Sequence, residues 1–206
     1  DIFRNNIFEG TLSLYRGINV TVENNTFRNS PGNALYSNVG YGLIVQNNTF
    51  TNNARGIYLD LASFAFPPVQ IRYNQIYGNQ IGIYAYDRST GIIEYNDIYN
   101  NLNYSLYNNQ DRNVTALNNW WGSANETLIA QSIYDFYDSQ TKGVVKFSPY
   151  LNSSVFPVPS TFLCGDVNKN GAVNLADIIY LVNYVFKGGP APIPLAAGDV
   201  NKNGQV

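Results

Sequence analysis

The chain has 206 residues, with 12 Lys and Arg against 14 Asp and Glu, which gives a net charge of −2 and a pI near 5.0. This balance disfavours binding to nucleic acid or to an anionic membrane, and no apolar run reaches the roughly 20 residues of a membrane span. There is no His and a single Cys, Cys164, so the commonest general base is missing and no disulfide can form within the chain.

The first 150 residues carry a repeat in which an Asn stands two positions before an aromatic or aliphatic residue. It occurs at Asn6, Asn25, Asn48, Asn74, Asn96 and Asn119. Short runs that alternate with period 2, such as residues 56–59 and 82–85, lie between these positions and predict strands. A unit of about 22 residues cannot bury its apolar face alone, so we expect stacking into a parallel β-solenoid of about five to six rungs. Asn suits the bends because it tolerates the left-handed conformation and can hydrogen-bond to the next rung.

A specific ending follows the repeat. It consists of Leu-Asn-Asn-Trp-Trp-Gly at 117–122, then residues 133–138 and 145–151. Together with the repeat, this ending resembles the right-handed parallel β-helix repeat proteins of the pectin-lyase-like fold, over residues 1–151. The resemblance implies an all-β solenoid whose open end is capped by the two Trp. It leaves the activity open, because this fold carries lyases, hydrolases, epimerases, adhesins and simple binders.

Four tyrosines recur at one point of the repeat. They are Tyr36, Tyr58, Tyr84 and Tyr107, and each follows an apolar residue. Alternation along a strand predicts that they point outward and form a column with one ring per rung. Such a column suits stacking of sugars, although tyrosines that simply stabilise neighbouring rungs would give the same pattern. The insertion at 61–68 carries Phe64 and Phe66, which would form the lip of a groove or a small apolar cluster of their own.

Charged residues follow the tyrosines at the next turn. They are Asp60, Asp87, Arg88, Asp111 and Arg112. The resemblance implies a possible role for them, since β-helix proteins that cleave acidic polysaccharides hold calcium with carboxylates on neighbouring rungs and use Arg or Lys as base. A glycoside hydrolase would instead need two carboxylates at a defined separation. Asp and Arg also occur at turns for local reasons, so the sequence leaves enzyme activity open.

The C-terminal part has a different pattern. Residues 152–163 contain Pro and Ser without a period and predict a linker. The stretch Gly165–Gly171 then returns letter for letter as Gly198–Gly204. In the first copy, oxygen ligands for calcium are expected from Asp166, Asn168, Asn170, the Ala172 carbonyl, Asn174 and Asp177. In the second copy, they are expected from Asp199, Asn201 and Asn203. Apolar residues after Asp177 predict a helix that ends at Gly188.

This duplicated loop with its helix is similar to the type I dockerin, over residues 164–206. The resemblance implies calcium-dependent folding and attachment of a secreted, mostly polysaccharide-degrading protein to a cohesin on a scaffold or cell surface. Position 5 of each loop is Asn170 or Asn203 where the family usually has Asp, so we expect weaker calcium binding. Leu175 and Ala176 replace the hydroxyl pair that commonly helps to select the cohesin.

Three functions remain after this reading. We expect first a secreted module that contacts glycans through the tyrosines and is tethered through the dockerin. A polysaccharide lyase or hydrolase with an Asp/Arg site is the second, and a structural surface or adhesin piece is the third. The chain opens at Asp1 without a signal sequence, so we expect an internal or processed piece of an extracellular or cell-surface protein.

Overall fold

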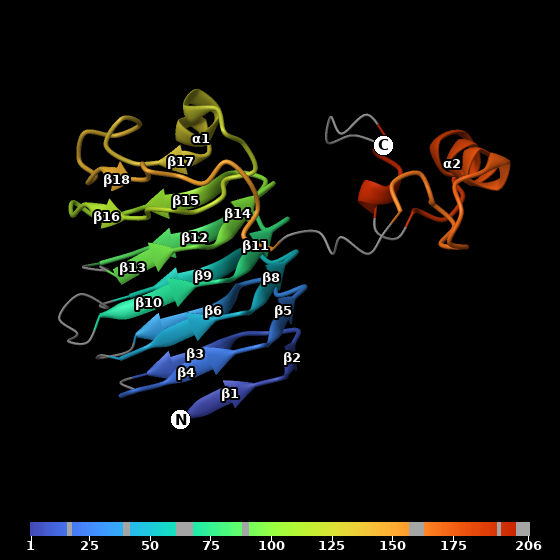
Figure 1. Cartoon of the computed structure of the whole chain (residues 1–206). Helices are drawn as coiled ribbons and strands as arrows, with labels where there is room; N and C mark the ends of the chain where they lie inside the picture. The colour runs from blue at the N-terminus through green and yellow to red at the C-terminus, as the bar shows by residue number, and fades with distance from the viewer. Residues whose placement is uncertain are drawn as a thin grey trace. The chain divides into compact units, whose positions relative to one another are not determined.

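The computed structural model describes residues 1–15, 18–38, 42–60, 68–87, 91–156, 163–192 and 195–200. It divides into two compact units, Asp1–Phe156 and Pro157–Val206, each of which is described by itself (Figure 1). Within the described segments, no helix is long and apolar enough to cross a membrane. Arg88, Phe64, Phe66, Asn201 and Asn203, which the sequence singled out, lie outside the described residues.

The first unit is a solenoid of about five turns built from three parallel sheets, as the sequence predicts (Figure 1). Sheet A contains, in spatial order, β1 (Ile2–Arg4), β4 (Thr21–Glu23), β7 (Ile44–Gln46), β10 (Val69–Arg72), β13 (Gly91–Glu94), β16 (Val114–Thr115) and β18 (Val145–Lys146). Sheet B contains β2 (Ile7–Phe8), β5 (Thr26–Arg28), β8 (Thr49–Thr51), β11 (Gln75–Tyr77) and β14 (Asp97–Tyr99). Sheet C contains β3 (Leu12–Tyr15), β6 (Asn33–Asn38), β9 (Arg55–Leu59), β12 (Ile81–Ala85), β15 (Tyr104–Asn108) and β17 (Ile133–Tyr134).

The core of the solenoid is made of inward-facing residues that repeat in register from rung to rung. On sheet C, Leu35, Ile57 and Ile83 pair in register and are fully buried. On sheet B, Phe27 stacks on Phe50 with ring centroids 4.6 Å apart. Because each apolar residue is covered by its equivalent in the next rung, strands of two to six residues are enough to build a continuous core.

The recurring Asn residues form the hydrogen-bonded ladder that the sequence predicts, here called the first Asn ladder. It runs through Asn6, Asn25, Asn48, Asn74, Asn96 and Asn119. In each step the backbone N–H of one Asn donates to the side-chain oxygen of the next at 2.9 to 3.0 Å. The side-chain amide donates to the same oxygen and to backbone carbonyls, as Asn74 does to Val45 and Arg72. The buried members of the ladder, from Asn25 to Asn119, therefore have their polar side-chain groups satisfied.

A second ladder lies five positions further along each rung, and the sequence analysis missed it. It runs through Ser30, Asn53, Asn79 and Asn101. The residue before each ladder position has a positive φ, for example Asn24 at 56° and Tyr73 at 55°. This left-handed residue turns the chain from one sheet into the next, which explains why Asn is also frequent just before the ladders.

The C-terminal end of the solenoid is covered, as expected from the two Trp. Trp121 is 4% exposed and belongs to the core, and the short helix α1 (Glu126–Gln131) adds Ile129 to the same core. The chain then returns along sheet B, where the carboxylate of Asp97 accepts hydrogen bonds from the Ser154 hydroxyl and the Val155 amide. The predicted linker thus begins as a segment that is held against the solenoid.

The second unit contains the loop 166–177, the helix α2 (Leu175–Lys187) and a 3-10 helix η2 (Leu195–Ala197). Asn174 and Asp177 form a reciprocal capping box at the start of α2. Gly188 closes the helix in the left-handed conformation, with φ 67°, so the predicted helix and its end are both found.

Candidate functional site

The outward face of sheet C carries a column of tyrosines, here called the Tyr column. The four predicted members pair in register with one another, and Tyr134 of β17 continues the column beyond them. The sequence analysis missed Tyr134 because the cap, with α1, interrupts the regular spacing. All five side chains are half-buried: Tyr36, Tyr58, Tyr84, Tyr107 and Tyr134.

The rings of the Tyr column lie face to face. Ring centroids are 5.4 Å apart for Tyr36 and Tyr58, 5.0 Å for Tyr58 and Tyr84, 5.1 Å for Tyr84 and Tyr107, and 4.2 Å for Tyr107 and Tyr134. Interplanar angles fall from 25° to 3° along this series. Since the faces between successive rings of the column are occupied by neighbouring rings, the column presents mainly ring edges and hydroxyl groups to a ligand and leaves no room for a sugar between two rings.

Polar and charged groups surround the Tyr column. The guanidinium of Arg55 lies 4.9 Å from the Tyr84 ring centroid and 5.7 Å from that of Tyr58. Burial raises the pKa of Tyr58 to about 12, so its phenol is neutral and able to donate a hydrogen bond at ordinary pH. Burial, followed by its hydrogen bond with Tyr134, likewise raises the pKa of Tyr107 to about 12.

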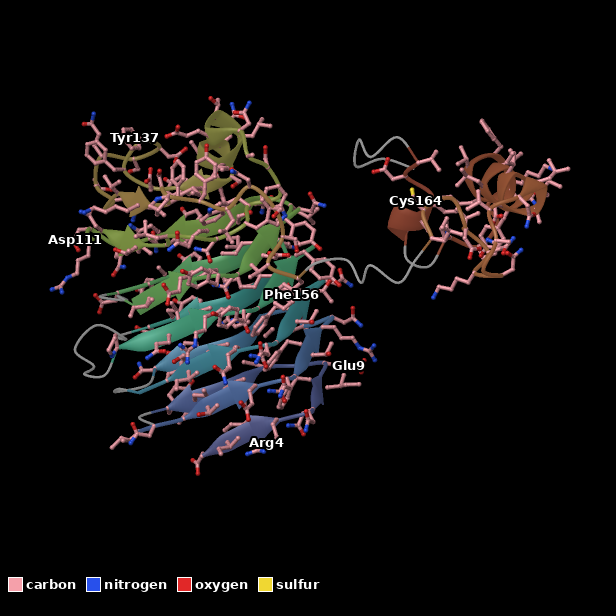
Figure 2. The ribbon with its side chains drawn as sticks, in the orientation of Figure 1. Arg4, Glu9, Asp111, Tyr137, Phe156 and Cys164 are labelled. Carbon is pink, nitrogen blue, oxygen red and sulfur yellow. The ribbon has the colours of Figure 1, made fainter. Side chains whose placement is uncertain are left out.

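The acidic candidates follow successive strands of sheet C. The Asp60 carboxylate accepts a hydrogen bond from the Tyr36 hydroxyl at 2.7 Å, which is the main reason that the pKa of Tyr36 is raised. Asp60 follows β9 directly, Asp87 lies two positions after β12, and Asp111 lies three positions after β15, at the outer edge of the solenoid (Figure 2). Arg112, beside Asp111, is exposed. Among the described residues, no group of three or more His, Cys, Asp or Glu side chains lies close enough together to share a metal ion.

The first calcium loop is organised by hydrogen bonds from its backbone to its own side-chain oxygens. Asp166 accepts from the amides of Asn170 at 3.0 Å and Gly171 at 2.8 Å. Asp177 accepts from Asn168 at 3.3 Å and from Asn174 at 2.9 Å, and these backbone bonds, with that of Asn174 first, lower its pKa. The Asp177 carboxylate is therefore held ionised, and Asp166 is fixed by its two backbone contacts in the same loop.

The chemistry of this loop fits a hard cation. Its expected ligands are two carboxylates, at Asp166 and Asp177, together with amide oxygens and the Ala172 carbonyl, and all of them are oxygen donors. Asn168 and Asn170 use their side-chain oxygens to accept backbone N–H groups within the loop, which orders them. Asp199, in the second loop, is half-buried. With only two carboxylates among these ligands, the residues fit calcium and are expected to bind it more weakly.

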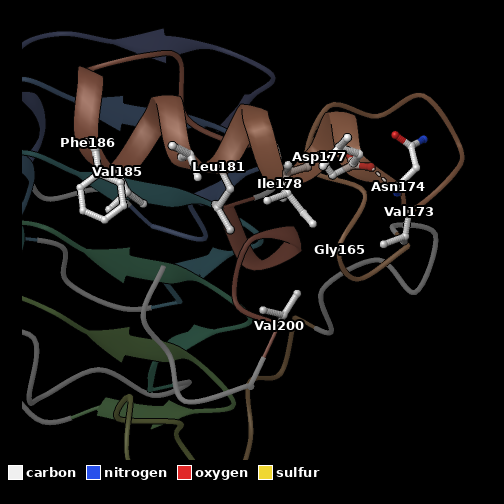
Figure 3. Close-up of a pocket in the computed structure, with 12 residues that line it drawn as sticks. Gly165, Val173, Asn174, Asp177, Ile178, Leu181, Val185, Phe186 and Val200 are labelled. Carbon is white, nitrogen blue, oxygen red and sulfur yellow. Dashed lines mark hydrogen bonds between the residues drawn. The ribbon is translucent and has the colours of Figure 1, made fainter.

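An apolar groove of about 580 Å³ runs along α2, as Figure 3 shows. Ile178, Leu181 and Val185 of the helix face Val173 and Val200 across it. The helix α2 is therefore amphipathic. In the described part of this unit, much of its apolar face is exposed.

Two family models match the chain. The model of the right handed beta helix region matches residues 1–121, and the model of the dockerin type I domain matches residues 164–206. No curated protein and no solved structure matches. Type I dockerin domains generally bind calcium and imply a cohesin partner, and the proteins that carry them are typically extracellular or attached to the cell surface. The parallel sheets, the Asn ladders and these matches show that the chain belongs to the right-handed β-helix family and ends in a type I dockerin domain.

Proposed function

We propose that this protein is a secreted module in which the β-helix contacts a glycan, while the dockerin tethers it to a cohesin-bearing scaffold or cell surface. It acts in the binding or breakdown of polysaccharide. The combination of a β-helix with a dockerin supports a cellulosome-type module, and the Tyr column supports the glycan as ligand.

The Tyr column suits a polyhydroxylated polymer because it repeats. Parallel strands place one phenol per rung at a spacing of about 4.8 Å, so a long ligand meets a row of equivalent hydroxyl groups. Arg55, Asp60 and Asn109 lie among these phenols and add donors and acceptors, since Asp60 binds Tyr36 and Asn109 binds Tyr84. A ligand bound here is recognised by hydrogen bonds and by ring edges.

Calcium would be held by the first loop, through Asp166, Asp177 and the amide oxygens between them. Bound calcium would neutralise the two carboxylates and fix the start of α2, to which Asn174 and Asp177 are joined by the capping box. The apolar face of α2 would thereby be presented in one orientation to a partner.

The glycan proposal is tested with the double variant Tyr58→Phe with Tyr84→Phe, which keeps the stacked rings and removes two hydroxyl groups. We expect retention on an insoluble glycan to weaken about thirtyfold, since each of the two hydrogen bonds is worth roughly 1 kcal/mol. Retention is measured by depletion from solution over a panel of insoluble polysaccharides.

The matched control is Tyr77→Phe with Tyr99→Phe. These tyrosines stack across neighbouring rungs at 5.4 Å in the same way, on sheet B. The control should keep full retention. Equal retention by both double variants and the unchanged protein would refute contact through the Tyr column, and equal losses in both would show that the sheet C face is not specific.

A further inference from the structure

A second cavity lies at the capped end of the solenoid, away from the repeating rungs. It has a volume of about 630 Å³ and lies between α1, β17 and the loop that follows β17; we call it the cap pocket. Its lining includes Glu126, Gln131, Asp135, Tyr137, Asp138 and Phe147. Its size falls in the range of about 300–1,000 Å³ that is usual for pockets that bind small molecules.

The loop that forms one wall of the cap pocket is held in place before any ligand arrives. Asp135 is 5% exposed, and its two carboxylate oxygens accept the amides of Tyr137 at 3.0 Å and Val145 at 2.7 Å. Asp138 in turn accepts the amide of Asp135 at 3.0 Å. A wall that is ordered in this way lowers the entropy lost on binding.

Aromatic surface is available in the cap pocket, in contrast to the Tyr column. Tyr137 is 84% exposed, and its ring meets Phe136 edge-on, with centroids 5.7 Å apart. Figure 2 shows Tyr137 at the end of the solenoid that carries α1. Phe147 lines the same cavity and is half-buried. An aromatic ring with a free face is the surface on which the C–H groups of a sugar ring pack.

Polar side chains with unused hydrogen-bonding capacity stand beside these rings. The carboxylate of Glu126 and the amide of Gln131 line the cavity from α1, and neither bonds to another side chain or backbone group in the described part of the protein. Glu126 can accept two hydrogen bonds, and Gln131 can both donate and accept, which suits neighbouring hydroxyl groups on a saccharide.

The charge of the lining restricts the class of saccharide that the cap pocket can bind. Three carboxylates, those of Glu126, Asp135 and Asp138, line the cavity, and its lining contains no Lys or Arg. An anionic sugar would meet like charges there without a compensating cation, whereas a neutral sugar or one with a free amino group would not.

We propose that the cap pocket is a second saccharide site, which takes a short segment of a neutral or amino-bearing glycan and rejects uronates. The choice of a saccharide rests on the proposed glycan-contacting function, but the residues are separate from the Tyr column. The Tyr column would bind along a polymer by hydroxyl groups, and the cap pocket would bind a few sugar units by aromatic packing.

The test is calorimetric titration of the whole protein with three soluble oligomers of equal length: a glucan, a glucosamine oligomer and a galacturonate oligomer. Tyr137→Ala should weaken binding of the first two about tenfold. Glu126→Gln should leave the glucan almost unchanged and weaken the glucosamine oligomer up to about fivefold, since an exposed ion pair is worth at most about 1 kcal/mol. The galacturonate oligomer should not bind here.

Two controls separate this site from the Tyr column. Leu128→Ala changes an exposed residue of α1 that does not line the cavity, and it should bind as the unchanged protein does. The Tyr58→Phe, Tyr84→Phe variant should keep its affinity for the oligomers while losing retention on insoluble glycan. The inference is overturned if neither the glucan nor the glucosamine oligomer binds, if Tyr137→Ala has no effect, or if galacturonate binds equally well. None of these results would affect the retention experiment.

Discussion

The solenoid and the dockerin unit differ in how far their apolar side chains are buried. In the solenoid, Leu35 and Ile57 are fully buried although the strands that carry them are only five or six residues long. In the dockerin unit, Leu175 and Phe186 of the much longer helix α2 are 69% and 79% exposed. A short strand is covered because an equivalent strand lies on each side of it, whereas a single helix needs a different partner to cover it. Repetition therefore covers the apolar side chains of the solenoid, whereas apolar side chains of α2 remain exposed in the described part of the dockerin unit.

The largest loss of stability is expected from a change in the first Asn ladder, which joins the rungs of the solenoid. Asn74 is fully buried, accepts two hydrogen bonds from Asn48 and donates three, to Val45, Arg72 and Asn96. Asn74→Ala leaves several buried groups without partners, so we expect a loss of at least about 3 kcal/mol in the free energy of unfolding. Urea denaturation followed by Trp fluorescence measures it, because both Trp lie in the solenoid.

Asn103→Ala is the matched control for this prediction. Asn103 is exposed and lies on a neighbouring rung, where only its backbone amide bonds, to Gln80. We expect a change below about 0.5 kcal/mol. A loss below about 1 kcal/mol in Asn74→Ala would contradict the view that the ladder holds the rungs together.

Calcium removal should affect the dockerin unit alone. Calcium at a hundred times its Kd stabilises the folded unit by about 2.7 kcal/mol, and this is lost on chelation. We expect a chelator to reduce the helical circular dichroism of α2 and to leave the denaturation of the solenoid unchanged. Asp166→Ala should abolish the response to calcium, whereas Asp111→Ala, in the solenoid, should preserve it. A chelator that lowered the stability of the solenoid equally would show that the two regions are not independent in this respect.

Acid should have opposite effects on the two regions. Burial raises the pKa of Asp97 above its ordinary value of 3.8, although bonds from Ser154 and Val155 oppose this. Its contribution to stability is therefore full below pH 3.8 and is lost as the pH rises through the raised pKa. The pKa of Asp177 is lowered, so its contribution is present above 3.8 and is lost as the pH falls through the lowered pKa. Unfolding is measured from pH 3 to 7 by Trp fluorescence for one unit and by helical dichroism for the other.

Asp97→Asn is the variant that isolates the first of these effects. The amide cannot titrate, so the solenoid should lose this part of its pH dependence while the dockerin unit keeps its own. An unchanged pH profile of the solenoid in Asp97→Asn would count against this assignment.

The smallest effect concerns the left-handed residues that both regions need. The dockerin unit uses Gly188 to end α2, whereas the solenoid uses Asn at most turns and Tyr at two, Tyr73 and Tyr95, each with φ 55°. These two rings stack at 5.8 Å, which offsets their strain. We expect Tyr73→Asn alone to be nearly neutral, and Tyr73→Asn with Tyr95→Asn to gain about 0.5–1 kcal/mol, because the second change relieves strain without further loss of stacking. Thermal denaturation measures both.

The reverse change, Asn47→Tyr, serves as the control for this prediction. Asn47 occupies the equivalent turn with φ 56°, and a tyrosine there is expected to cost about 1 kcal/mol. If both Tyr73→Asn and the double variant were less stable than the unchanged protein, stacking and not strain would decide which residue is preferred at these turns.

Much of the fold could be predicted from the sequence because residues that contact each other on neighbouring rungs of a solenoid recur at a regular interval along the chain. The positions of Asn25, Asn48 and Asn74 predicted both the rungs and the ladder that joins them. The second Asn ladder escaped notice because Ser30 replaces one member and because many other Asn residues lie nearby. The left-handed residue before each ladder position explains this excess, but its conformation is visible only in the backbone.

The candidate sites were harder to predict, since they depend on orientation and on contacts between distant segments. Alternation placed Tyr58 and Tyr84 on the outer face of sheet C, but it could not show that their ring faces lie against each other. The cap pocket unites α1 with Tyr137 and Phe147, which share no repeat. The calcium ligands could be proposed from the sequence because they are local in it, and the assignment of calcium to the loop remains a prediction.

The first Asn ladder also gives the solenoid a direction. In every step, an amide of the earlier rung donates and the side-chain oxygen of the later rung accepts, from Asn6 through to Asn119. The amide dipoles of the column therefore point the same way and polarise one another. If a rung were added in the inverted orientation, the side-chain oxygens of two ladder Asn residues, or their two amide groups, would face each other. The hydrogen bonds of the ladder can therefore form only with a rung that runs in the same orientation, and an inverted rung would leave them unmade.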